Sequence, residues 1–187
     1  MEPPQIRAFV PDKDPFPCAR CERFPVMKLL ALTLAQALAL ALAAAPAAAS
    51  CVLPDNVKAL QAEVLAGMNA QRRARGLPAL QMDAKLGRAA QGHACDNAAR
   101  QSYSHVGSDG SELQNRLGRS GYRYRLAAEN TGRGFGTAER AVQWWMNSAH
   151  HKDNILLAPV VDVGIGIALS DAPDSRLHWV VNFGKEK

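Results

Sequence analysis

Two β-branched runs near the C-terminus limit the folds open to this chain more than any other feature. The first run, VVDVGIGIALS (residues 160–170), alternates branched residues with small or polar ones, and the second, LHWVVNFG (residues 177–184), is also rich in strand formers. Because only the turn sequence DAPDSR separates them, we expect the two runs to pair as an antiparallel hairpin. A doubly wound parallel sheet needs a long crossover between successive strands and is therefore disfavoured.

Helical periodicity dominates the chain before this hairpin. Apolar residues recur three and four positions apart in a first segment that ends near Arg75 and in a second segment that contains Leu86. Residues that favour helix N-termini stand where helices are expected to begin: Asn56, Asp83, Ser111 and Thr137. The third of these opens an S-x-x-Q capping box, and its short helix is expected to end near Gly121.

A short strand is expected in RLAAENTGRGFG (residues 125–136), followed by a glycine-rich loop. Pro159 is expected to end the later segment that holds His150 and His151. Helices therefore come first and strands mixed with helices follow. This order is typical of an α+β domain in which helices pack against an antiparallel sheet.

The N-terminal quarter of the chain is expected to lie outside this domain. Residues 27–49 run from Met27-Lys28 through LLALTLAQALALALAAA to Ala47-Ala48-Ala49, which is the order of a secretory signal peptide, although the apolar run also approaches the length of a membrane anchor. The Pro-rich residues 1–26 are interpreted as an upstream extension from a mis-called start, and their Cys18/Cys21 pair lacks further zinc ligands nearby. The folded domain is then expected to span residues 50–187.

The exported chain would keep two cysteines, Cys51 and Cys95. In an oxidising compartment an even pair usually closes a disulfide, and this is the favoured prediction. Lipidation of Cys51 is the alternative, but Ala48 is a poor match to the larger apolar residue that such a signal wants three positions earlier. The sequence thus predicts a secreted or periplasmic protein with no transmembrane span in its mature chain, and a lipoprotein is the less favoured interpretation.

The charge of the chain gives no sign of a nucleic-acid partner. It carries 22 Lys and Arg residues against 17 Asp and Glu residues, which is a formal net charge of +5. The arginines are scattered rather than gathered in a stripe, so a solvated surface is the better interpretation.

Several residues could carry chemistry, but each also has a structural interpretation. They are His93, His105, Glu129, Glu139, His150, His151 and His178. His93 falls on the apolar stripe of the second helix and is expected to be a satisfied core histidine. His178 could face solvent from the last strand, and Glu139 suits the first turn of its helix, where a carboxylate favours the helix dipole.

The order of the polar strings resembles one known family. The strings are SHVGSDGS (104–111), the Glu-Asn dipeptide of RLAAENTG, WMNSAHHKDNIL (145–156), VDVGIGIAL and HWVVNFG. Over residues 57–184 the chain is similar to the CAP superfamily (cysteine-rich secretory, antigen 5 and pathogenesis-related proteins), in its bacterial SCP-like extracellular branch. The resemblance implies an α-β-α sandwich whose central antiparallel sheet is flanked by helices.

The resemblance also implies a cleft that collects histidines and acids. Matched by motif, its residues would be His105, Glu129 and His151, whereas His150 stands where the family usually has glycine. Asn147 stands about where some relatives keep a second acid, so the expected set is His-Glu-His with an amide. His105 and His151 could hold Zn²⁺ with help from Glu129, but the missing acid weakens a hydrolase interpretation.

Three functions remain open at this point. The favoured one is a non-enzymatic domain whose His/Glu cleft binds a metal ion, a lipid, a glycan or a protein. The second is a metal-dependent hydrolase that uses His105, Glu129 and His151, and the third is a structural cell-envelope protein. A serine hydrolase is disfavoured because no G-x-S-x-G motif is present.

Overall fold

The computed structural model describes residues 51–173 and 176–187, so the extension and signal peptide expected over residues 1–49 lie outside the described residues. Five helices and four strands follow one another in the described part of the chain. Their order is α1 (Val57–Arg73), β1 (Gln81–Met82), α2 (Ala84–Ala99), α3 (Leu113–Ser120), β2 (Tyr124–Arg133), α4 (Ala138–Asn147), α5 (Ala149–Ile155), β3 (Asp162–Leu169) and β4 (Leu177–Glu186).

The expected C-terminal hairpin is present at the centre of the sheet. Strands β3 and β4 pair antiparallel, with Asp162 opposite Gly184 and Leu169 opposite Leu177. β2 pairs antiparallel with the other side of β4, which gives the order β1-β3-β4-β2. The expected central antiparallel sheet is therefore confirmed, and the two-residue strand β1 adds to its edge parallel to β3.

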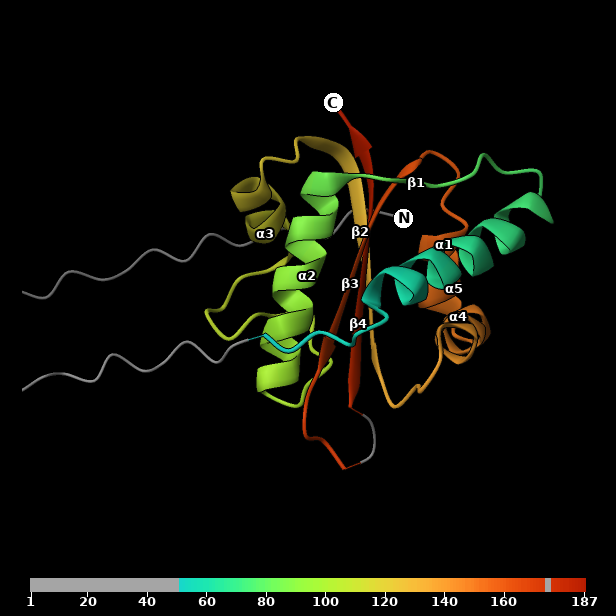
Figure 1. The fold of residues 1–187 in the computed structure, drawn as a ribbon. Coiled ribbons are helices and arrows are strands. Elements are labelled where there is room, and N and C mark those ends of the chain that lie inside the picture. The colour runs from blue at the N-terminus through green and yellow to red at the C-terminus, as the bar shows by residue number, and fades with distance from the viewer. Residues whose placement is uncertain (1–50, 174–175) are drawn as a thin grey trace, which may run out of the picture. The chain divides into compact units, whose positions relative to one another are not determined.

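Helices cover both faces of the sheet, as expected for an α-β-α sandwich (Figure 1). α2 and α3 lie on one face, and α1, α4 and α5 lie on the other (Figure 1). The alternation in VGIGIAL (residues 163–169) gives the two faces of β3 different side chains, with branched residues on the face of the larger apolar core and glycines on the face of α2. Val163, Ile165 and Ile167 join the larger apolar core with Trp145. A Cβ added at Gly164 or Gly166 would lie 2.0 or 2.3 Å from the backbone of α2, so these glycines let α2 pack directly on β3.

Local capping signals place three helix starts. Asp83 Oδ1 accepts a hydrogen bond from Leu86 N at 2.8 Å, and Thr137 Oγ1 accepts one from Arg140 N at 3.2 Å. Asn56 stands at the N-cap of α1 but makes no side-chain cap there. The capping box of α3 lies one residue later than predicted, because Glu112 N donates to Asn115 Oδ1 at 3.0 Å. The helix ends, as expected, at left-handed Gly121.

The predicted disulfide joins Cys51 to Cys95, whose Cα atoms lie 5.2 Å apart. The bridge fixes the start of the described chain to α2, and Val52 O accepts a hydrogen bond from Leu169 N next to it. A thiol in a disulfide is not free to carry a lipid, so this pairing disfavours lipidation of Cys51. No helix in the described ranges is long and apolar enough to cross a membrane.

Candidate functional site

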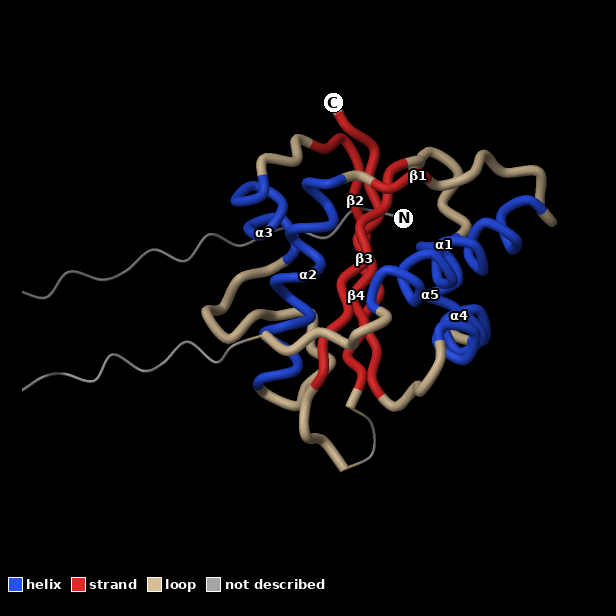
Figure 2. The backbone as a smooth tube through the Cα atoms, in the orientation of Figure 1, coloured by secondary structure: helices blue, strands red, loops and turns tan. Residues whose placement is uncertain are grey.

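The candidate site is built on β2, which is an edge strand of the sheet. Figure 2 shows this sheet in red between the two helical layers. Successive residues of a strand point to opposite faces, so the Glu129-Asn130 dipeptide serves both helical layers. Glu129 bonds residues of the loop after α2 and of α3, whereas Asn130 bonds α5. The dipeptide therefore connects the two layers at the sheet edge.

The carboxylate of Glu129 is buried and saturated with donors. His105 Nδ1 lies 2.9 Å from Oε1, and Arg116 Nη2 donates to Oε2 at 2.7 Å. With the amide of Asn182 oriented so that its nitrogen faces Glu129, it also donates to Oε2 at 3.0 Å. The side chain of Glu129 is only 3% exposed, so these partners compensate a charge that burial alone would penalise.

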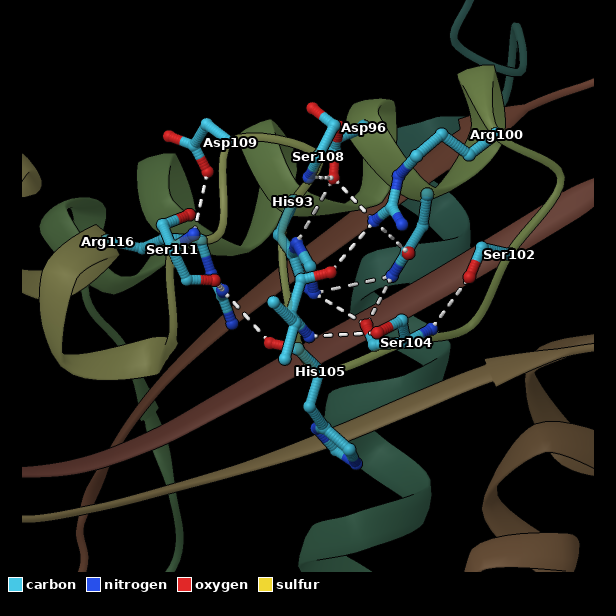
Figure 3. Close-up of polar contacts among 12 residues, drawn as sticks. His93, Asp96, Arg100, Ser102, Ser104, His105, Ser108, Asp109, Ser111 and Arg116 are labelled. Carbon is cyan, nitrogen blue, oxygen red and sulfur yellow. Dashed lines mark hydrogen bonds and ion pairs between the residues drawn. The ribbon is translucent and has the colours of Figure 1, made fainter.

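His93 completes this buried cluster from α2. Its Nε2 lies 2.8 Å from the Ser104 carbonyl (Figure 3). The same atom lies 3.9 Å from Glu129 Oε1. Burial is the main reason why the pKa of His93 is lowered below its ordinary value of 6.5, although the charge of Glu129 opposes it. The expected burial is confirmed, but the expected full satisfaction was wrong, because Nδ1 makes no hydrogen bond in the described part of the chain.

On the other layer, asparagines hold His151. Asn154 Nδ2 donates to Asn130 Oδ1 at 2.9 Å, and Asn130 Nδ2 donates to the His151 carbonyl at 3.0 Å. His151 Nδ1 lies 2.8 Å from Ser148 Oγ, and its ring packs on Trp144 with centroids 4.9 Å apart. Burial, followed by the positive charges of His105 and His150, lowers the pKa of His151.

The structure brings His105 and Glu129 into direct contact, and both line a depression of about 320 Å³ beside the start of α3. His151 is linked to the same strand through Asn130 rather than through its own ring. Asn147 ends α4 exposed, and in the described residues its side chain makes no hydrogen bond to the other three. Its participation in a ligand site stays a prediction. His150 is exposed, as expected.

A resident zinc ion is a poor match to these donors. Among the residues that the structure describes, no three His, Cys, Asp or Glu side chains lie where they could share a metal ion. Zinc sites ordinarily take three or four protein ligands. His105 and His151 alone fall short of this, since both oxygens of Glu129 already face fixed donors.

Sequence reasoning missed several members of the site. Arg116 has no local motif, whereas Asn130 and Asn154 belong to strings that were quoted without a role. His178, for which a solvent-facing position was one interpretation, is instead fully buried, with Nε2 2.8 Å from Ser170 Oγ and Nδ1 2.8 Å from the Ser102 carbonyl. Glu139 occupies the first turn of α4, as predicted.

Comparison with known proteins identifies the family of the chain. The family model described as "CAP: Cysteine-rich secretory protein family" matches residues 65–183. The chain is 31% identical over 113 residues to the Bacillus subtilis protein YkwD, which is described as uncharacterized; the match covers 60% of this chain and 44% of YkwD. The chain thus spans less than half the length of the curated relatives it matches.

Solved structures share the fold. An extracellular protein containing a SCP domain from Bacillus anthracis superposes with a TM-score of 0.61 at 26% identity, over 73% of this chain and 45% of that one. An outer surface protein from Borrelia burgdorferi superposes with a TM-score of 0.65 at 21% identity, over 74% of this chain and 100% of that one. Because the family model covers most of the described domain, this chain belongs to the cysteine-rich secretory protein (CAP) family.

Proposed function

We propose that this CAP domain is an exported, non-enzymatic binding domain that holds an amphipathic lipid at the edge of β2. The polar head of the lipid would lie against His105 and His151, and its apolar part against Trp144. The observation that carries the proposal is that both histidines have their Nδ1 atoms occupied, by Glu129 and by Ser148.

This arrangement prepares the two imidazoles to accept hydrogen bonds. An imidazole that donates from Nδ1 carries a bare lone pair on Nε2. The carboxylate of Glu129 accepts from His105 Nδ1, and the side chain of His105 is 58% exposed. Ser148 Oγ can accept from His151 Nδ1 in the same way. A ligand head group with hydroxyl or amine donors matches two such acceptors.

An aromatic ridge beside His151 supplies the apolar half of the site. Trp144 is 45% exposed and packs between Phe135, at a centroid distance of 5.1 Å, and His151. An exposed tryptophan that is held by two rings offers a rigid apolar surface with little side-chain entropy left to lose on binding.

Catalysis is less well supported by the same contacts. A general base needs an atom free to take a proton from the substrate. Glu129 is the only acid of the expected set, and its two oxygens already face His105, Arg116 and Asn182. Its contacts suit a group that positions His105, so the metal-dependent hydrolase remains the weaker alternative.

Export is part of the proposal. The signal-like segment over residues 27–49 precedes the domain, and the Cys51–Cys95 disulfide is of a kind that persists in oxidising compartments. Production of the full chain in a bacterial host, followed by mass measurement of the exported form, tests this. The expected product begins at Ser50 and contains one disulfide, whereas a diacylglyceryl mass on Cys51 would contradict it.

Lipid binding is tested by extraction of the purified exported protein with organic solvent and mass spectrometry of the extract. We expect a lipid from the wild type, a large loss from Trp144→Ala and from His151→Ala, and no change from His150→Ala. His151→Ala should stay folded, because α5 is anchored through the main-chain carbonyl of His151. Equal lipid in all four proteins, or none in the wild type, would reject the proposal.

A structural role in the cell envelope is the second candidate, and the buried cluster around Glu129 favours it. His105→Ala separates the two. A lower melting temperature with unchanged lipid content indicates a structural network, whereas reduced lipid with a small change in melting indicates a binding site. Zinc uptake by the wild type that His105→Ala abolishes would instead indicate a metal site.

A further inference from the structure

A second depression, of about 460 Å³, lies between α2, α3 and the loop that joins them. Its lining includes Gly92, His93, Asp96, Ser108, Arg116 and Arg119. His105, Glu129 and His151 do not line it, so it is distinct from the proposed lipid site. Its volume falls in the range of about 300–1,000 Å³ that is usual for small-molecule sites.

His93, one of the residues that line this depression, carries a buried hydrogen-bond acceptor with no hydrogen bond among the described residues. His93 Nε2 lies 2.8 Å from the Ser104 carbonyl, which can only accept, so the hydrogen of the neutral ring is on Nε2 (Figure 3). His93 Nδ1 is then a bare lone pair, and Asp96 Oδ2, at 3.9 Å, is too far away for a hydrogen bond and would itself only accept (Figure 3). The side chain is 0% exposed, and in the described part of the chain Nδ1 makes no hydrogen bond.

Arg116, which lines the same depression, carries a buried hydrogen-bond donor of the same kind. Arg116 Nη1 donates to the carbonyls of His105 and Ser111, and Nη2 donates to Glu129. The third group, Nε–H, is buried and makes no hydrogen bond among the described residues. Buried polar groups are nearly always paired, so the unpaired acceptor of His93 and the unpaired donor of Arg116, two residues that line one depression, call for polar partners from outside the chain.

Charge around the depression favours a neutral ligand. Arg119 pairs with Asp109 at 2.5 Å, Arg116 with Glu129 at 2.7 Å, and Asp96 with Arg100 at 2.7 Å. An anion would meet the lone pair of His93 and the carboxylate of Asp96, and a cation would meet Arg116. Arg88 donates to the Ser120 carbonyl at the rim.

We propose that this depression is a binding site for a neutral polyhydroxylated ligand, such as a sugar unit of a glycan. A hydroxyl group both donates and accepts, so the hydroxyls of a sugar can donate to His93 Nδ1 and accept from Arg116 Nε–H once the two side chains turn these buried atoms toward the depression. Ser108 and Ser111 place further hydroxyl groups on the lining.

The site offers a variant that fills it without disturbing the fold. A Cβ added at Gly92 meets no atom within 4 Å, so Gly92→Leu should project into the depression, and replacing a mid-helix glycine should not weaken α2. Gly87→Leu is the matched control. Gly87 lies on the same helix, its added Cβ is equally free, and it does not line the depression.

The experiment titrates glucose and maltose into the exported full chain and follows amide and imidazole NMR signals. We expect saturable shifts at Gly92, Ser108, Ser111 and His93 Nδ1, a loss of affinity of at least about tenfold in Gly92→Leu, and wild-type affinity in Gly87→Leu. Parallel titrations use inorganic phosphate and zinc chloride, and melting curves confirm that both variants fold.

Four outcomes would overturn the proposal. They are no sugar-dependent shift in the wild type, equal affinity in Gly92→Leu, saturable binding of phosphate or zinc but not of sugar, and shifts confined to His105 and His151. The lipid content of the protein is measured separately. A failed sugar titration therefore leaves the proposed function standing, and a failed lipid extraction leaves this site standing.

Discussion

Two buried arginines, one on each side of the sheet, show how the same side chain can serve a core or a site. Arg72, on α1, donates from Nε, Nη1 and Nη2 to the carbonyls of four residues at 2.7–3.1 Å: Pro78, Ile155, Leu157 and Val160. Arg116, on α3, bonds a carboxylate as well as two carbonyls, makes no hydrogen bond from Nε among the described residues, and lines a depression.

The difference lies in what surrounds each charge. Arg72 donates hydrogen bonds both to the loop before β1 and to the segment that begins at the end of α5, so it links these two parts of the backbone. Burial lowers the pKa of Arg72. The carbonyl oxygens around the guanidinium offset the cost of burying its charge, because the fold holds them in place. Arg116 holds Glu129, which in turn holds His105. A buried arginine whose three nitrogens all donate to carbonyls therefore indicates a structural role, whereas one that pairs with an acid beside a cavity indicates a site.

The largest effect should come from Arg72→Met. The substitution leaves four carbonyls without their donor, and each buried acceptor left without a hydrogen bond costs about 1–3 kcal/mol, so we expect a loss of several such contributions together. Urea unfolding measures the loss, and Arg73→Met, an exposed neighbour on the same helix, is the control. Lipid and sugar binding per folded molecule should not change. A loss below about 1 kcal/mol in the free energy of unfolding would contradict the role of Arg72 as a link between these two segments.

Glu129→Gln should cost less stability but should change the site. Arg116 loses its anionic partner while one acceptor remains, so we expect a loss of about 1.5–3 kcal/mol, the range for hydrogen bonds to charged groups. His105 also loses the acceptor that selects its tautomer, and imidazole NMR should show its two tautomers becoming mixed. If the His105 signals stay unchanged, Glu129 does not position that ring, and the contrast with Arg72 becomes weaker.

Lowering the pH should reduce the stability of the fold through protonation of His93, which interacts with Arg116 and Glu129. The folded-state pKa of His93 is lowered, so below about pH 6.5 the unfolded chain binds more protons, and this part of the stability is lost as the pH falls through the folded pKa. One such proton changes stability by at most about 1.4 kcal/mol per pH unit. Arg116 opposes protonation of His93, whereas Glu129 and Asp96 favour it.

Urea unfolding at several pH values between about 7.5 and 5 measures this dependence. His93→Gln, which keeps a donor for the Ser104 carbonyl, should flatten the curve. His150→Gln changes an exposed ring and is the control. His151 adds a dependence of the same sign, because its pKa is also lowered. A wild-type slope in His93→Gln would assign the acid sensitivity to His151 or to another group.

The sequence predicted what local signals encode. The hairpin followed from alternation, and the caps at Asp83 and Thr137 followed from residue type. β1 could not be predicted, because its two residues become a strand only when Gln81 N meets the Val161 carbonyl, eighty residues away. Arg116 was missed for the same reason: nothing in LQNRLGRS marks a buried cation, and its acid comes from the next strand.

The smallest predicted effect is a difference in the sign of the stability change between two glycine-to-alanine substitutions, one in each helical layer. Gly92→Ala on α2 adds a methyl group in open space, and removal of a mid-helix glycine should stabilise the fold by about 0.5–1 kcal/mol. Gly67→Ala on α1 gains the same propensity, but its Cβ would lie 3.3 Å from Val142 Cγ2 on α4, so strain should cancel or reverse the gain. Thermal unfolding of the two variants provides the measurement. Equal stabilisation in both variants would mean that the α1–α4 contact accommodates an added methyl group as easily as the open depression beside Arg116 does. The contrast between a tightly packed layer and an open one would then depend on the two arginines alone.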